Sequence, residues 1–256
     1  MLLEGAKEMI EVKWCGFDFG QCLMEPTNLR NPLLFGDILK KTGKPEQISR
    51  TIRKYRILKE KYVEYGIIKE GHRDEILNYV LDGEQEAMDL FNIMEKELLG
   101  PGKGLEEALI YLKSEQIDIN VVSELKKTLG AMTANIISMF LKKNNLTSYF
   151  NELITPQGKI NVKDNNIDLG YMGLTKQAGT IYDKLKEDLK QKGILPSEAV
   201  IIGDKPATDI IPAKERGFYT IQYTGYIDYG PSGAHYKVSN FLELTRLIKG
   251  KVKYYG

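Results

Sequence analysis

The sequence contains little cysteine, histidine or tryptophan: its 256 residues include two cysteines, two histidines and one tryptophan. Cys15 and Cys22 flank one predicted strand end, so they indicate neither a disulfide framework nor a zinc site, and we expect a cytoplasmic protein. With so few histidines, we expect neither His72 nor His235 to bind a metal ion. These scarcities disfavour the disulfide-rich and zinc-binding classes of protein.

The sequence also lacks long apolar runs and an excess of charge of one sign. Lysine and arginine number 36 against 35 acidic residues, for a formal net charge of +1. Bulk electrostatics therefore predicts neither a nucleic acid nor a membrane surface as a partner. No apolar run approaches the ~20 residues of a membrane span. With 42% hydrophobic and 28% charged residues, the composition is typical of a globular protein that buries a substantial core.

The spacing of apolar residues changes twice along the chain. Between about residues 33 and 99 they recur at helical spacing, with glycines between the helical segments. Before and after this region, short apolar runs alternate with amphipathic helices. We therefore predict an α/β fold with a doubly wound, mainly parallel, Rossmann-like sheet core formed by residues 1–24 and 100–256. An all-helical domain, residues 25–99, is inserted after the first strand.

Two segments near the end of the core need separate predictions. Across residues 157–170, apolar positions alternate on either side of Asp164-Asn165-Asn166, which predicts a surface hairpin rather than another helix. Residues 241–248 have the apolar spacing of an amphipathic helix that closes the domain.

A carboxylate follows each of two predicted buried strands. Asp18 comes after an apolar run and is followed by Gly20, which lets the chain turn; Asp204 follows the run at residues 199–203, and Asp209 lies five positions later. Taken alone, Asp18 would be a turn former and Asp209 a helix cap. Because parallel strands end at one edge, where open α/β sheets bind ligands, the three aspartates together predict a site for a divalent cation.

Two other polar residues lie between these carboxylates in the sequence. Ser123 ends the predicted strand at residues 117–122, although a serine there could simply cap the strand. Lys176 opens a predicted helix. The hairpin at residues 157–170 leaves the register of this lysine open, so Lys159 or Lys163 could occupy the same place.

In this order, the four features resemble the four motifs of the haloacid dehalogenase (HAD) superfamily, over nearly the whole chain. The first motif resembles FDFGQCL at residues 17–23, and the second resembles VVS at 121–123. The third is similar to KQAGTIY at 176–182, and the fourth resembles GDKPATD at 203–209. In that family, a helical insert after the first motif is called a type 1 cap.

The resemblance implies a Mg²⁺-dependent phosphohydrolase that acts on a small phosphorylated metabolite. Asp18 would attack phosphorus and form an aspartyl-phosphate, which water then hydrolyses, because bound Mg²⁺ offsets the repulsion between carboxylate and phosphate. Cap closure would exclude water and select the substrate. The implied Mg²⁺ ligands are Asp18, the Gly20 carbonyl, Asp204 and, directly or through water, Asp209. The implied phosphate-binding groups are Gly20, Gln21, Ser123 and Lys176.

The sequence departs from the family pattern at Gly20, where most phosphatases of the family have a second aspartate. That aspartate protonates the leaving oxygen, and such general acid–base help contributes roughly 10²–10⁴-fold. The departure leaves two alternatives: a HAD-type hydrolase of a carbon–halogen or carbon–phosphorus bond, or a catalytically weak protein that binds a phosphorylated ligand or a partner. Cys22 and Glu124 are further departures. The sequence indicates neither a particular substrate nor an oligomeric state.

Overall fold

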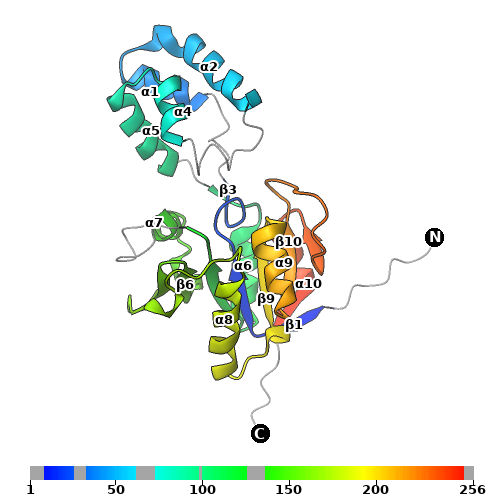
Figure 1. The fold of residues 1–256 in the computed structure, drawn as a ribbon. Helices are drawn as coiled ribbons and strands as arrows, with labels where there is room; N and C mark the ends of the chain where they lie inside the picture. Colours follow the sequence, from blue (N-terminus) through cyan, green and yellow to red (C-terminus); the bar gives the residue numbers. More distant parts are fainter. Residues whose placement is uncertain (1–8, 26–32, 62–72, 98–99, 126–135, 251–256) are drawn as a thin grey trace, which may run out of the picture. The chain divides into compact units, whose positions relative to one another are not determined.

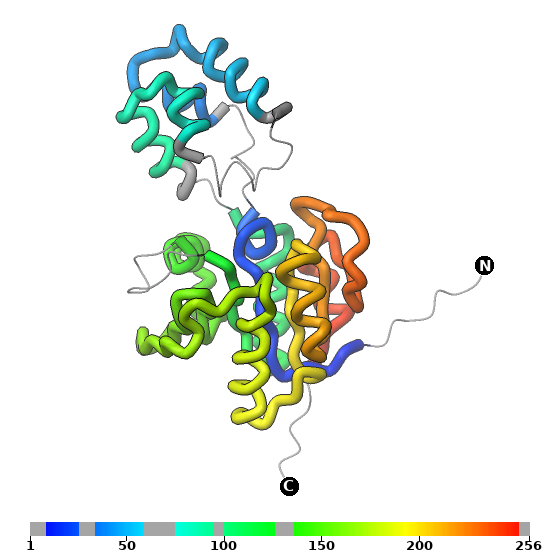
Figure 2. Tube along the Cα trace, in the orientation of Figure 1, coloured from blue at the N-terminus to red at the C-terminus, as the bar shows by residue number. Residues whose placement is uncertain are grey.

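The computed structural model describes residues 9–25, 33–61, 73–97, 100–125 and 136–250. The chain divides into two compact units, one of Met1–Glu25 with Pro101–Gly256 and one of Pro26–Gly100 (Figure 1, Figure 2). The sequence predicts the domain boundaries after residues 24 and 99, and each lies one residue before the boundary in the structure. Across the described ranges, none of the helices is both long and apolar enough to cross a membrane.

The first unit is built on an eight-stranded sheet with the order β11-β10-β9-β2-β5-β6-β7-β8. The strands are β2 (Trp14–Phe17), β5 (Asp118–Val122), β6 (Glu152–Thr155), β7 (Gly158–Asn161), β8 (Ile167–Asp168), β9 (Ala199–Gly203), β10 (Tyr219–Tyr223) and β11 (Tyr236–Val238). From β11 to β6 neighbouring strands are parallel, whereas β6, β7 and β8 pair antiparallel. The predicted mainly parallel α/β fold is confirmed.

Strand β2 lies at the point where the order of the sheet reverses, because later strands are added on both of its sides. Phe17 pairs with Val121 of β5 and with Ile202 of β9. The residues that follow these three strands are therefore brought to one edge. This is where open α/β sheets bind ligands.

Apolar side chains cover both faces of β2, which is why all four of its residues are buried. Trp14 belongs to a cluster on one face that includes Leu185 of α8 (Thr180–Gln191) and Ala213 of α9 (Ile211–Glu215). Phe17 packs against the rings of Phe150 and Phe241, at centroid distances of 6.4 and 5.9 Å. The other α-helices in the described part of this unit are α6 (Leu105–Ser114), α7 (Ile136–Lys143) and α10 (Leu244–Leu247).

Three parts of this unit differ from the expected structure. The helix predicted for residues 241–248 is a short 3-10 turn (Phe241–Glu243) followed by α10. The chain then enters strand β12 (Ile248–Gly250), which pairs in parallel with β1 (Ile10–Val12). The predicted hairpin is present as β7 and β8, but it extends the main sheet instead of standing apart from it. Lys176 lies in the turn before α8, which begins at Thr180.

The second unit is helical over its described residues, as the sequence predicts. Its helices are α1 (Leu33–Lys41), α2 (Ile48–Lys61), α4 (Arg73–Val80) and α5 (Gln85–Glu97), with a 3-10 turn at Pro45–Gln47. The ring of Phe35 on α1 lies 5.0 Å from that of Tyr55 on α2 and 5.4 Å from that of Phe91 on α5. These aromatic contacts join three helices into one core. Where the chain passes between the units, β3 (Met24–Glu25) pairs with β4 (Gly100–Pro101).

Candidate functional site

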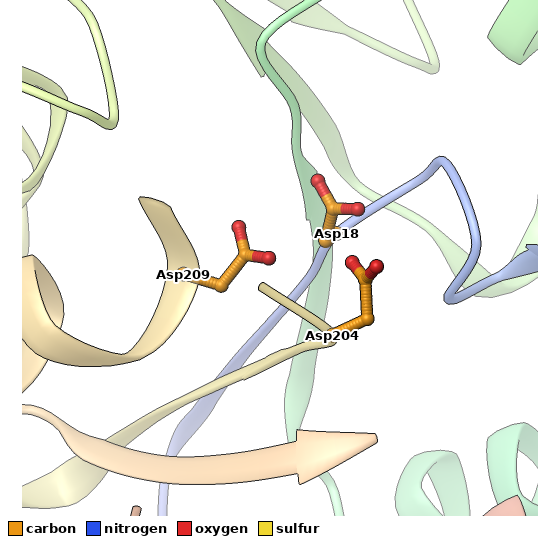
Figure 3. Close-up of side chains that lie close together, drawn as sticks. All are labelled: Asp18, Asp204 and Asp209. Atoms are coloured by element: carbon orange, nitrogen blue, oxygen red, sulfur yellow. The ribbon is translucent and has the colours of Figure 1, made fainter. Parts of the chain in front are cut away.

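Three aspartates meet where strands β2 and β9 end (Figure 3). Asp18 directly follows β2, Asp204 directly follows β9, and Asp209 lies in the π-helical turn Pro206–Ile210. One carboxylate oxygen of each residue lies within 4.8 Å of the others. The structure thus brings together the three carboxylates that the sequence grouped.

The backbone around Asp18 turns sharply and leaves space beside it. The amide of Asp18 donates to the carbonyl of Ile202 at 2.8 Å, which continues the pairing of β2 with β9 by one residue. Gln21 then takes a left-handed conformation, with φ of 66°. A Cβ atom added to Gly20 would meet no atom within 4 Å. Gly20 therefore borders open space, and its side-chain position is not filled by any neighbouring described residue.

A second glycine allows two of the carboxylates to approach each other. A Cβ atom on Gly203 would lie 2.5 Å from the Cβ and Cγ atoms of Asp209. The chain can therefore carry Asp209 against the end of β9 only because residue 203 lacks a side chain. Asp209 is further held by the Lys205 amide, which donates to its Oδ2 at 2.9 Å.

The carboxylate of Asp204 is fully buried, and neither of its oxygens has a hydrogen-bond partner among the described residues. Burial and the neighbouring carboxylates of Asp209 and Asp18 raise the pKa of Asp204 well above its ordinary value. A buried carboxylate without a partner is costly, and a cation would supply the missing partner. Hard divalent cations such as Mg²⁺ prefer oxygen ligands of this kind. The residues present therefore fit a Mg²⁺ ion.

Lys176 supplies a positive charge to this cluster. Its side chain is 1% exposed, and Nζ lies 2.7 Å from Asp18 Oδ1 and also donates to Asp209 Oδ1. Burial lowers the pKa of Lys176, but the two carboxylates outweigh this effect and hold the pKa well above its ordinary value. Burial raises the pKa of Asp18 to about 6; Lys176 opposes the rise and Asp209 adds to it.

The structure distinguishes among the three lysines that the sequence left open. Lys159 pairs with Asp188 at 2.7 Å, and Lys163 is exposed on the hairpin. Among the described contacts of these three lysines, only those of Lys176 reach Asp18 and Asp209. The sequence left its register open because the hairpin lies between Lys176 and the preceding strand.

Ser123 and Gln21 are both buried near strand ends. Ser123 directly follows β5; its amide donates to the Ile154 carbonyl at 2.9 Å, and its Oγ accepts from the Leu125 amide at 3.3 Å. The Gln21 side chain accepts from the Tyr229 hydroxyl at 2.9 Å. Tyr229 was not among the residues that the sequence singled out for the site.

Glu124 is a residue whose role the sequence did not indicate. Its Oε1 accepts hydrogen bonds from the backbone amides of Lys176 and Gln177. The sequence marked Glu124 only as a departure from a motif. No local pattern links it to a turn 52 positions away.

Comparisons with known proteins agree with this geometry at the level of the fold. No protein-family model matches the sequence, and no curated protein matches it. Among solved structures, a HAD phosphatase from Thermococcus onnurineus matches with a TM-score of 0.53 at 19% identity, over 91% of this chain and 96% of that one. The chain has the fold of the haloacid dehalogenase superfamily.

The solved structures with the HAD fold include enzymes of more than one kind. A Bacillus subtilis protein described as a HAD-hydrolase was solved bound to magnesium; it matches with a TM-score of 0.57 at 15% identity, over 91% of this chain and 97% of that one. A dehalogenase solved as an intermediate complex matches with a TM-score of 0.56 at 14% identity, over 95% of this chain and all (100%) of that one. The HAD fold is therefore shared by phosphatases and dehalogenases.

Proposed function

We propose that the protein is a Mg²⁺-dependent phosphohydrolase that acts on a small phosphorylated metabolite, with Asp18 as the nucleophile. The observation that carries the proposal is the buried carboxylate of Asp204, which has no hydrogen-bond partner among the described residues and lies beside Asp18 and Asp209. The magnesium found in a protein of the same fold supports the choice of metal.

The three aspartates and the main-chain carbonyl of Gly20 would hold the metal ion. When bound, Mg²⁺ would supply positive charge that offsets the repulsion between the Asp18 carboxylate and a phosphate group. Gly20 can serve in this role because a ligand from its backbone needs no side chain. Asp209 would bind directly or through a water molecule, and its contact with Lys176 keeps one of its oxygens oriented.

Residues of the chain would carry out the attack on phosphorus and would bind the phosphoryl oxygens. One Asp18 oxygen forms a bond to phosphorus while the bond from phosphorus to the leaving oxygen breaks, and a water molecule then releases phosphate from Asp18. Lys176, already 2.7 Å from Asp18 Oδ1, donates to the phosphoryl oxygens as negative charge develops on them. The Ser123 hydroxyl, together with Gly20 and Gln21 in the turn after β2, would complete the set of groups that bind the phosphate.

Gly20 cannot protonate a leaving group, so the protein should prefer substrates whose leaving group needs no proton. Acyl and aryl phosphates satisfy this condition, whereas sugar phosphates lose a basic alkoxide. Hydrolysis of a carbon–halogen or carbon–phosphorus bond is favoured by the same observation, since no alkoxide leaves in those reactions. We rank carbon–halogen hydrolysis second because the site holds a lysine beside the nucleophile that could bind a phosphoryl group, which a haloacid lacks. Carbon–phosphorus hydrolysis would use the same lysine, and we rank it second because the carbanion that leaves would need a further stabilising group.

The proposal is tested by turnover assays with Mg²⁺ on wild type and Asp18→Asn. The panel contains acetyl phosphate, p-nitrophenyl phosphate, sugar phosphates, a haloacid and a phosphonate. We expect wild type to hydrolyse acetyl phosphate and p-nitrophenyl phosphate, and Asp18→Asn to lose ~10⁴-fold or more of that activity, as removal of a nucleophile does. Asp183→Asn is the matched control, because Asp183 is exposed on α8 and pairs with Arg216.

Other results of the same panel would replace the proposal. Release of halide, or cleavage of the phosphonate, without phosphatase activity would identify the second class of reaction. No turnover of any compound, with beryllofluoride still bound in the presence of Mg²⁺, would identify a protein that binds phosphorylated ligands without hydrolysing them. Equal activity of wild type and Asp18→Asn would exclude Asp18 as the nucleophile.

A further inference from the structure

Glu124 connects two parts of the candidate site that lie far apart in the sequence. It follows Ser123 at the end of β5, and its Oε1 accepts hydrogen bonds from the backbone amides of Lys176 and, at 3.0 Å, Gln177. A carboxylate that accepts two backbone N–H groups forms charge-assisted bonds, which are shorter and stronger than bonds between neutral groups. Glu124 therefore ties the turn that carries Lys176 to the end of a central strand.

Among the described residues, the other backbone hydrogen bonds that leave this turn lead to α8 and to Arg216, not to a central strand. The Thr175 amide donates to Thr180 Oγ1 at 2.9 Å, and Arg216 Nη2 donates to the Ala178 carbonyl at 3.4 Å. Lys176 precedes α8 by four residues and so has no place in the hydrogen bonds of that helix. Two bonds within the turn join neighbouring residues: the Ala178 amide donates to Thr175 Oγ1 at 3.2 Å, and the Gly179 amide donates to the Lys176 carbonyl at 2.9 Å. These local bonds set the shape of the turn, but they do not set its distance from β2.

The position of the Lys176 ammonium depends on that distance. The side chain is almost fully buried, and its Nζ reaches Asp18 Oδ1 at 2.7 Å. If the backbone of the turn moved outward, Nζ could not keep this contact. A misplacement of about 1 Å at a reacting group can cost on the order of 10²-fold in rate.

We propose that Glu124 is a positioning residue that holds the backbone of Lys176, so that the ammonium group meets Asp18 and the phosphoryl group. The inference rests on the proposed function for its catalytic consequence, but the positioning itself is a structural property. The two amide donors need an acceptor oxygen at this place; the negative charge strengthens the bonds, but a neutral acceptor of the same length can still form them.

The test compares Glu124→Ala, which removes the acceptor, with Glu124→Gln, which keeps an acceptor oxygen on a side chain of the same length. Glu106→Ala, at an exposed position in the first turn of α6, is the control for loss of a glutamate. We measure kcat and KM with p-nitrophenyl phosphate and Mg²⁺, the melting temperature, and hydrogen exchange at the Lys176 and Gln177 amides.

We expect Glu124→Ala to lower kcat by ~10–100-fold with a smaller change in KM, and to expose both amides to faster exchange. Glu124→Gln should recover most of the rate and of the protection, which a purely electrostatic role for Glu124 would not allow. The rise in melting temperature on adding Mg²⁺ should be at least as large in Glu124→Ala as in wild type, because Glu124 is not among the proposed metal ligands and a displaced Lys176 leaves more negative charge for the cation to neutralise.

Each contrary result has a distinct meaning. Unchanged exchange at the two amides in Glu124→Ala, or equal losses of rate in the Ala and Gln variants, would overturn the positioning role. If wild type hydrolyses no substrate but Glu124→Ala still loses protection at these amides, the proposed function fails and the positioning role stands. A fall in kcat that merely follows a fall in melting temperature, with both amides still protected, would assign Glu124 to stability alone.

Discussion

The ammonium of Lys176 lies 2.7 Å from Oδ1 of Asp18, although 158 positions separate the two residues in the sequence. Both side chains are buried, so the ion pair is weakly screened by solvent. Lys176 also contacts Asp209 and thus partly neutralises a cluster of three carboxylates. This arrangement links the stability of the metal-free protein to the chemistry proposed for the site.

Replacing Lys176 with methionine should destabilise the metal-free protein. The change keeps the length of the side chain but leaves Asp18 and Asp209 buried without their cation, and breaking a buried pair in this way typically costs ~3–5 kcal/mol. Urea unfolding in EDTA measures the loss. Mg²⁺ should restore part of it, because the cation neutralises the same carboxylates.

Lys192→Met provides the comparison for this variant, since the exposed Lys192–Glu152 pair should contribute ~1 kcal/mol or less. Equal unfolding free energies for wild type and Lys176→Met in EDTA would contradict the prediction.

The stabilising effect of Mg²⁺ should increase with pH. Burial raises the pKa of Asp18 from 3.8 to about 6, and the pKa of Asp204 rises in the same direction. The folded-state pKa of Asp18 exceeds its unfolded value, so the contribution of Asp18 to stability is fully present below pH 3.8 and is lost as pH rises through about 6. The contribution of Asp204 also falls as pH rises. Mg²⁺ competes with the bound protons. The rise in melting temperature on adding Mg²⁺ should therefore be larger at pH 8 than at pH 5.

Asp204→Asn is the control for this linkage, because it removes one proposed ligand and one titrating group. Its Mg²⁺-induced shift should be small at every pH. A shift in wild type that does not depend on pH would argue against these carboxylates as the metal site.

Introducing an acid at position 20 should extend the range of substrates. A side chain at Gly20 meets no atom within 4 Å of its Cβ, so Gly20→Asp should fold normally. We expect kcat/KM for sugar phosphates to rise by ~10²–10⁴-fold, the usual contribution of general acid–base catalysis. Acetyl phosphate, whose leaving group needs no proton, should change little.

Gly20→Asn separates the acid from the added bulk in that experiment. If Asp and Asn variants give the same rates on sugar phosphates, the missing acid does not limit turnover of these substrates.

Removing the Asp188 carboxylate should destabilise the attachment of the β7–β8 hairpin. Asp188 on α8 accepts hydrogen bonds from Lys159 of β7 at 2.7 Å and from the buried Tyr171 hydroxyl at 2.9 Å. Asp188→Ala leaves both donors without this acceptor, at an expected cost of ~2–4 kcal/mol. Thermal and urea unfolding measure the change.

Asp183→Ala, on the same helix, removes the more exposed Arg216 pair and should cost ~1 kcal/mol or less. Similar losses for the two variants would show that Asp188 behaves as an ordinary surface group.

Local sequence determined most strands of the eight-stranded sheet, most of the helices and the edge at which the aspartates lie. The strands before Asp18 and Asp204 are short and carry no charged residue, a pattern typical of strands that are buried on both faces of a parallel sheet. Since parallel strands end at the same edge, the meeting of these two carboxylates follows from the order of elements. The pairing of β1 with β12 did not follow, because both strands are three residues long and too short to show periodicity.

Tertiary structure alone decided which lysine reaches the aspartates and what holds it there. Lys159 and Lys176 are both flanked by turn-forming sequence, and only the pairing of β7 with β6 directs Lys159 toward Asp188 instead. The contact of Glu124 with the Lys176 turn likewise depends on how two loops pack, because no periodic pattern connects residues so far apart. The sequence determined which residues stand at the edge of the sheet through local hydrophobic spacing, whereas the packing of distant segments decided which of them touch.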